Sequence, residues 1–401
     1  MSDEEIAAIG DERDRWVTVG GASLLSVALG AYELVPASVT PLIREALAVD
    51  AAEAGLLVSV MFGTAVVASV PVGVALDRTN SRTAIAVAVG VLLVAGVWGW
   101  AAATAESFSG LLASRVLGGI AYVVVWNAGI DVVGRAFPPD RQATAVATFT
   151  ASGPVGFAVG QGTGPLVADT LGWPAVFPVY TGLAVVGLAL FWPASRGGGR
   201  ASGTDAPSLS ALRGVVTNPQ VLLVGALGFL GYALYLFVNT WAPSYLTDEL
   251  ALSLGASGLV VAAFPAVGVV SRISGGLLSD RLFGGRRRPV VLWSFVVAAP
   301  AVAALTLPAS VGAVLALLVV AGAAIQLCLG LVFAYVRELV APATAATAVA
   351  VLTSVGLAGA FVAPIAGGAV ISALGYPAAF AIAGALGAVG AALAWVAPEP
   401  D

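Results

Sequence analysis

Residues 289–336 read PVVLWSFVVAAPAVAALTLPASVGAVLALLVVAGAAIQLCLGLVFAYV and contain no charged side chain. A helix needs about 20 apolar residues to cross the hydrocarbon core of a bilayer, so this run is long enough for two crossings. Proline and glycine at 308–312 are typical of the turn between them. We therefore predict membrane-spanning helices near 289–307 and 311–336.

Uncharged runs recur along the whole chain. Of its 401 residues, 59% are hydrophobic and 10% are charged, whereas soluble proteins carry about 25% charged residues. This composition predicts an all-α polytopic membrane protein with twelve transmembrane helices. We expect the other ten spans near 16–41, 53–76, 83–104, 109–134, 142–168, 173–193, 220–246, 255–278, 344–373 and 377–397.

The basic residues predict the orientation of the chain. If the N-terminus is cytoplasmic, 14 of the 17 arginines lie in cytoplasmic loops, which leaves Arg44 outside and Arg115 and Arg272 within spans. The opposite orientation violates the positive-inside bias. Both termini are therefore expected in the cytoplasm, and residues 1–15 show no secretory signal.

The composition changes at 194–219, where glycine, serine and proline are frequent, which is typical of a flexible connector. It divides the chain into two predicted bundles of six helices. The expected parts are a cytoplasmic tail at 1–15, a bundle at 16–193, a cytoplasmic linker at 194–219, a bundle at 220–397 and a cytoplasmic tail at 398–401.

The two halves repeat each other at an offset of 203 residues. This offset places ATAVAT at 143–148 on ATAVAV at 346–351, and LGWPAVF at 171–177 on LGYPAAF at 374–380. One ungapped offset across several spans indicates a duplicated six-span unit. Both copies then enter the membrane from the same side. We expect them to be related by an axis along the membrane normal, with solute bound between them near the midplane.

Composition also limits cofactors and source. The chain has no histidine and only Cys328, so neither a metal site nor a disulfide within the chain is expected, and no other cofactor. All 17 basic residues are arginine, against 22 acidic residues. We hold as a compositional hypothesis that the chain comes from the cell membrane of a prokaryote adapted to high salt, such as a haloarchaeon.

Several motifs resemble those of the major facilitator superfamily. GVALDRTNSR at 73–82 and GLLSDRLFGGRRR at 276–288 resemble its loop signature, although Asn80 and Ser81 depart from it. RVLGG at 115–119 is similar to a motif of its fourth span, and the glycines of 156–165 are similar to the fifth span of its antiporters. The resemblance implies two six-helix bundles and no enzymatic activity.

The resemblance also implies a gating role for the two signature loops. The residues concerned are Gly73, Asp77, Arg78 and Arg82 in the first loop and Gly276, Asp280 and Arg281 in the second. In the alternative interpretation, these arginines only keep their loops in the cytoplasm.

A finer likeness covers the first two spans. ELVPASVTP at 33–41 and AGLLVS at 54–59 resemble the drug:proton antiporters of the arabinose-efflux-permease type. This likeness implies export that is driven by protons.

Two intramembrane charges support that expectation. Glu33 lies about 25 Å along the first span, and Arg115 lies at a similar expected depth in the fourth. Because charged groups inside a bilayer are costly, such groups are usually functional. We predict that Glu33 carries a proton opposite Arg115, directly or through water; the alternative is a static ion pair. Asp131 either joins this proton path or pairs with Arg135 one turn away.

Further polar residues are candidates for the wall of the solute cavity: Asn127, Tyr235, Asn239, Arg272 and Gln326. By resemblance to superfamily members that transport anions, Arg272 would bind an organic or inorganic anion. Alternatively, the Arg272 side chain extends to the membrane interface. The ring of Tyr235 would then only pack against neighbouring helices.

The first functional hypothesis is therefore a secondary transporter that exports small solutes by alternating access and proton coupling. The alternative is a symporter or exchanger of small anions. The expected partners are a small-molecule substrate, protons and the lipid bilayer, with no nucleic acid, and we expect a monomer. The sequence has neither a nucleotide-binding loop nor a long soluble domain, so it gives no support to an enzyme or a receptor.

Overall fold

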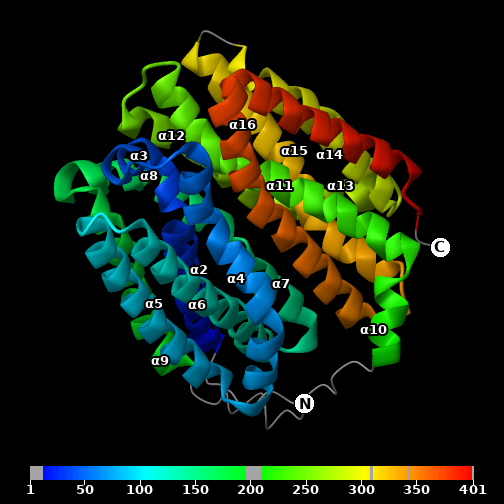
Figure 1. Cartoon of the computed structure of the whole chain (residues 1–401). Helices are drawn as coiled ribbons and strands as arrows, with labels where there is room; N and C mark the ends of the chain where they lie inside the picture. Colours follow the sequence, from blue (N-terminus) through cyan, green and yellow to red (C-terminus); the bar gives the residue numbers. More distant parts are fainter. Residues whose placement is uncertain (1–11, 196–208, 308–309, 342–343, 400–401) are drawn as a thin grey trace. The chain divides into compact units, whose positions relative to one another are not determined.

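A computed structural model of the chain describes residues 12–195, 209–307, 310–341 and 344–399 (Figure 1). All regular secondary structure within these ranges is helical. The chain divides into two compact units, Met1–Ala48 with Gly63–Thr204 and Val49–Phe62 with Asp205–Asp401. The start of α4 is thus grouped with the second unit, where Gly55 lies beside Pro364 and Trp241.

The helices of the first unit follow the uncharged runs of the sequence. They are α2 (Glu12–Ser38), α3 (Thr40–Leu47), the later part of α4 (Ala51–Arg78), α5 (Ser81–Thr104), α6 (Phe108–Arg135), α7 (Pro139–Thr150), α8 (Ser152–Leu171), the short η1 (Trp173–Ala175) and α9 (Val176–Ala194). Side-chain caps begin two of them, because Asn80 accepts from the Arg82 amide and Ser107 from the Gly110 amide.

The second unit is built in a similar way. Its helices are α10 (Leu209–Val216), α11 (Pro219–Asp248), α12 (Leu254–Ala266), α13 (Gly268–Leu282), α14 (Arg287–Ala303), the short η2 (Ala304–Thr306), α15 (Val311–Glu338) and α16 (Ala345–Val396). The backbone of Gly375 has φ 81°, which breaks α16 into two arms (Figure 1).

Within the described residues, ten helices are long and apolar enough to cross a membrane. The predicted span 142–168 falls on α7 and α8, and neither is among the ten. The predicted spans 344–373 and 377–397 lie together in α16, a 52-residue element. A polytopic helical membrane protein is confirmed, whereas the count of twelve spans and the cytoplasmic termini stay predictions.

The internal repeat recurs in the packing of each unit. In the first unit α2 packs against α8 and α9, and in the second α11 packs against α16. A methyl group on Gly156 would lie 2.6 Å from the Val27 carbonyl oxygen, and one on Gly359 would lie 2.2 Å from that of Phe229. Gly156 and Gly359 are related by the 203-residue offset. These glycines therefore permit the same close approach of helices in both units.

Candidate functional site

Arg115 on α6 binds the main chain of α2. Its Nη1 donates to the Tyr32 carbonyl oxygen at 2.6 Å and its Nη2 to the Glu33 carbonyl oxygen at 2.5 Å. The guanidinium also lies over the Tyr32 ring, 4.5 Å from its centroid. Proline has no N–H, so Pro36 cannot donate to the carbonyl four residues earlier, which is that of Tyr32. Arg115 supplies the missing donor from another helix.

Glu33 is buried beside this contact. Its side chain is 1% exposed, and it interacts electrostatically with Arg115. In the described part of the chain its Oε1 has no hydrogen-bond partner. A buried carboxylate without a donor is costly, whereas the neutral acid is less so. Thus the structure brings Glu33 and Arg115 together, and their hydrogen bond runs through the main chain.

Four of the five predicted cavity residues form a cluster inside the second unit. Arg272 on α13 donates through Nε to Gln326 Oε1 at 2.6 Å. Tyr235 on α11 interacts with the side chains of Arg272, Gln326 and Asn239. Tyr235, Asn239 and Gln326 are buried, and Arg272 is half-buried. The cluster therefore joins three helices that are far apart in sequence.

The guanidinium of Arg272 is only partly engaged. Its Nε is bonded to Gln326, and within the described ranges neither terminal nitrogen has a hydrogen-bond or ion-pair partner. Arg272 lies ten residues before the end of α13, or about 15 Å along the helix. A pair of parallel N–H donors at this depth fits the two oxygens of a carboxylate or a comparable anion.

The remaining predicted residues of the first unit, Asp131 and Asn127, have surroundings of their own. Asp131 forms an ion pair with Arg135 one turn away and accepts a hydrogen bond of 2.6 Å from Ser81 Oγ. Asn127 is exposed on α6. The predicted roles of these two residues in proton coupling and in the solute cavity stay predictions.

The first signature loop is held by an arginine and a tryptophan. Arg82 donates through Nη2 to the Trp192 carbonyl oxygen at 2.7 Å, and its guanidinium lies 3.8 Å from the centroid of the Trp192 ring. Arg78 is exposed, and a methyl group on Gly73 would meet open space. The Asp77 side chain lies outside the described part of the chain.

The second signature loop is held by an ion-pair network. Arg287 bonds Asp280 at 2.8 Å and Glu338 at 2.9 Å, and its Nη1 also donates to Ser279 Oγ at 3.0 Å. Arg281 is exposed, and Gly276 has open space around its Cα. The network ties the loop to the end of α15.

Sequence reasoning missed four of these contact residues: Ser81, Trp192, Arg287 and Glu338. The offset of 203 residues could have indicated one of them, because it aligns Arg135 with Glu338 and thereby reverses a charge at equivalent helix ends. Nothing in the sequence pattern indicated that Trp192 would lie against Arg82.

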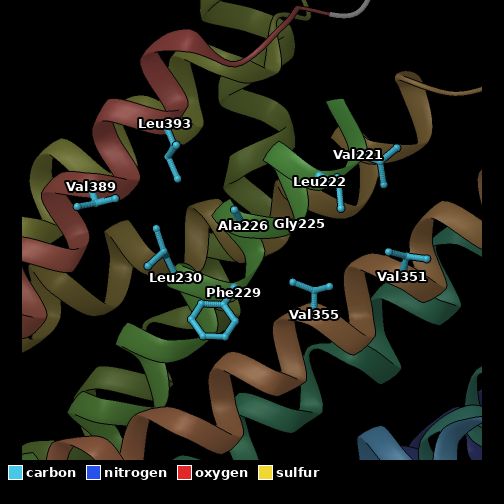
Figure 2. Close-up of a pocket in the computed structure, with 10 residues that line it drawn as sticks. All are labelled: Val221, Leu222, Gly225, Ala226, Phe229, Leu230, Val351, Val355, Val389 and Leu393. Carbon is cyan, nitrogen blue, oxygen red and sulfur yellow. The ribbon is translucent and has the colours of Figure 1, made fainter. Parts of the chain in front are cut away.

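A groove in the second unit differs in chemistry from the polar cluster. Figure 2 shows side chains that converge on it from α11 and from both arms of α16. The groove has a volume of about 400 Å³, and its lining is apolar: Val221, Leu222, Gly225, Ala226, Phe229, Leu230, Val351, Val355, Val389 and Leu393. Such a lining suits hydrocarbon and offers a polar solute no hydrogen bond.

Comparisons with known proteins agree with this architecture. The chain is 24% identical over 257 residues to the uncharacterized MFS-type transporter YtbD of Bacillus subtilis (strain 168), a match that covers 63% of each protein. It is 25% identical over 267 residues to the hexuronate transporter of the same organism, which covers 63% of this chain and 62% of that one. Each match spans less than two thirds of the relative's length.

A similar fold is found among crystal structures. The bacterial homolog to the human lysosomal transporter Spinster, in its inward-facing and unoccupied conformation, has a TM-score of 0.81 and 19% sequence identity. The likeness covers 97% of this chain and 98% of that one, and it concerns the fold alone. The family model of the Major Facilitator Superfamily matches residues 21–284 and 238–401, so the chain belongs to this superfamily.

Proposed function

We propose that the chain is a secondary transporter of a small anion and that Arg272 binds the anion. The half-buried guanidinium carries this proposal, because its terminal nitrogens are without partners within the described ranges while its Nε is fixed by Gln326. A fixed pair of charged donors inside a span is expensive unless a ligand uses it. The similarity to a hexuronate transporter supports a carboxylate as the anion.

The remaining residues of the cluster suit a solute with hydroxyl groups. Tyr235 lies beside Arg272 and carries a phenol, and Asn239 lies beside Tyr235 and carries a carboxamide. These groups can bond the hydroxyls of a sugar acid while the guanidinium bonds its carboxylate. We propose alternating access as the mechanism, as in the first hypothesis from the sequence.

Reconstitution into liposomes tests the anion site. Purified protein should exchange labelled D-glucuronate or nitrate across the membrane. Arg272→Gln should raise the KM for the transported anion at least tenfold, because it removes a charge-assisted pair of hydrogen bonds. Arg213→Gln, at an exposed arginine of α10, is the matched control and should transport normally. Unchanged transport of both anions by Arg272→Gln would refute the proposal.

A second proposal, proton-coupled export, rests on Glu33. The carboxyl group is 1% exposed and its Oε1 has no hydrogen-bond partner in the described residues, which suits a group that exchanges a proton during the cycle. The drug:proton antiporter likeness of 33–41 and 54–59 supports export in exchange for protons.

A substitution at Glu33 can separate proton-driven accumulation of the solute from the exchange of solute for solute. In liposomes with an imposed pH gradient, the unmodified protein should move solute against its gradient. Glu33→Gln should lose this accumulation and keep the exchange of solute for solute, because glutamine cannot release a proton. If Glu33→Gln accumulates solute as well as the unmodified protein, Glu33 is not the proton site.

A further inference from the structure

Gln326 lies between Arg272 and a break in the neighbouring helix. Its side chain is fully buried on α15. Its Oε1 accepts from Arg272 Nε at 2.6 Å, and its Nε2 donates to the Pro265 carbonyl oxygen at 3.5 Å. Besides its interaction with Tyr235 on α11, the carboxamide therefore bonds two further helices, α13 at Arg272 and α12 at Pro265.

The contacts on α12 and α13 lie where these helices meet. α12 ends at Ala266 and α13 begins at Gly268. Pro265 has no N–H to donate, so the helical hydrogen-bond ladder is already weakened at this point. A helix bends most easily where its backbone hydrogen bonds are missing. The break between α12 and α13 is therefore the part of this span that can change direction at least cost.

Gly268 makes room for the carboxamide. A methyl group at this position would lie 1.7 Å from Gln326 Nε2, which is far inside van der Waals contact. Arg272 follows Gly268 by one helical turn, so the amide sits on the same face as the guanidinium that it bonds. The glycine, the amide and the arginine thus form one continuous contact from the break to the proposed anion site.

We infer that Gln326 is a positioning residue that couples occupancy of Arg272 to the bend between α12 and α13. This inference rests on the proposed anion site. An anion on the terminal nitrogens moves the guanidinium, and the bond from Nε to Gln326 passes that movement to the Pro265 carbonyl. The break can respond because Pro265 lacks the N–H that would otherwise bond the Val261 carbonyl one turn earlier. Occupied and empty sites would therefore favour different bends.

Amide hydrogen exchange of residues 261–272 tests the coupling in the full-length protein. D-Glucuronate and nitrate are the probes, each added at a saturating concentration. In the unmodified protein the bound anion should change the exchange rates of this segment. Gln326→Met keeps the length of the side chain and removes both hydrogen bonds. It should weaken anion binding about tenfold and abolish the anion-dependent change even when the site is saturated.

Two further variants keep the test decisive. Gly268→Ala should displace the carboxamide and reproduce the loss of response, whereas Gly255→Ala, on α12 with open space around it, should behave as the unmodified protein. Gln326→Glu retains an acceptor for Arg272, removes the donor to Pro265 and adds a charge. It should lower anion affinity at least tenfold and abolish the anion-dependent change in amide exchange of residues 261–272.

The outcomes separate this inference from the proposed function. If the unmodified protein binds neither anion, the anion function is overturned and the coupling falls with it. If the unmodified protein binds an anion and Gln326→Met still shows the full anion-dependent change in exchange, the positioning role alone is overturned. A transport assay adds a further distinction, because Gln326→Met should lower kcat as well as raise KM.

Discussion

Arg115 stabilises the contact between α2 and α6 through main-chain atoms. Arg115→Gln should therefore leave two buried carbonyl oxygens, those of Tyr32 and Glu33, without charged donors. The Tyr32 carbonyl is then unsatisfied, because Pro36 cannot donate to it, and the Glu33 carbonyl loses a charge-assisted bond, so we expect the free energy of unfolding to fall by about 3 kcal/mol. Thermal unfolding of the purified protein in detergent measures the loss.

Glu33→Gln is the matched variant for stability. Its backbone carbonyl stays in place, and its side-chain Oε1 has no hydrogen-bond partner in the described residues, so the melting temperature should stay close to that of the unmodified protein. If Glu33→Gln destabilises the protein as much as Arg115→Gln, the side chains rather than the main chain hold these helices together.

The sequence predicted these residues better than their contacts. A charge inside an uncharged run identifies Glu33 and Arg115 on energetic grounds alone. The atoms that bond depend on how two helices approach, and periodicity carries no information on that distance. The spacing between Tyr32 and Pro36 does hold a clue, because a proline exposes the carbonyl four residues earlier. Arg272 and Gln326, 54 residues apart, offered no such clue.

At the scale of secondary structure, two glycines form equivalent breaks. Gly172 has φ 83° before η1 and Gly375 has φ 81° inside α16, and the 203-residue offset aligns them. Only glycine adopts this backbone conformation without strain. We expect Gly375→Ala to lower the free energy of unfolding by about 2 kcal/mol, as measured by thermal unfolding.

The control for this effect is a glycine without the special conformation. Gly182 lies within α9, and a methyl group there meets open space. Gly182→Ala should be neutral or stabilising by up to about 1 kcal/mol, because alanine loses less entropy in a helix. Equal destabilisation by both variants would show that the backbone at Gly375 is not the cause.

The sequence predicted helices where apolar runs are long, and it was less informative where they are interrupted. The span expected at 142–168 corresponds to α7 and α8, with a break at Ala151 just before Gly153 and Pro154 that the length of the uncharged run did not reveal. The break between α12 and α13 follows Pro265, yet the run at 255–278 predicted one continuous helix. Such breaks depend on partners such as Gln326, which belong to another helix.

At the scale of the whole molecule, the predicted orientation and number of spans can be tested by labelling. Cys328 is buried, so the unmodified chain should not react with a membrane-impermeant maleimide. Thr79→Cys and Thr217→Cys should react only from the cytoplasmic side of the membrane. Glu249→Cys should react only from the opposite side, because α11 lies between it and Thr217.

Labelling of Thr170→Cys tests whether the predicted span at 142–168, which is not among the ten membrane-length helices, crosses the membrane. Three predicted crossings separate Thr170 from Thr79, so it should be labelled from the outside. If it reacts from the same side as Thr79, then α7 and α8 do not cross the membrane and the prediction of twelve spans is wrong. Charge bias predicted the orientation, but the number of crossings depends on whether a glycine-rich helix with Gln161 and Asp169 enters the bilayer.

The hold of Arg115 on carbonyl oxygens has an evolutionary consequence. Every amino acid has a main-chain carbonyl, so the hydrogen bond from Arg115 remains possible when the residue at position 33 is replaced. A descendant of this chain can therefore lose or replace the acid that would carry the proton and keep the architecture intact. The contact between α2 and α6 and the ion that drives transport can then evolve independently, so a different coupling ion can be adopted without a change of fold.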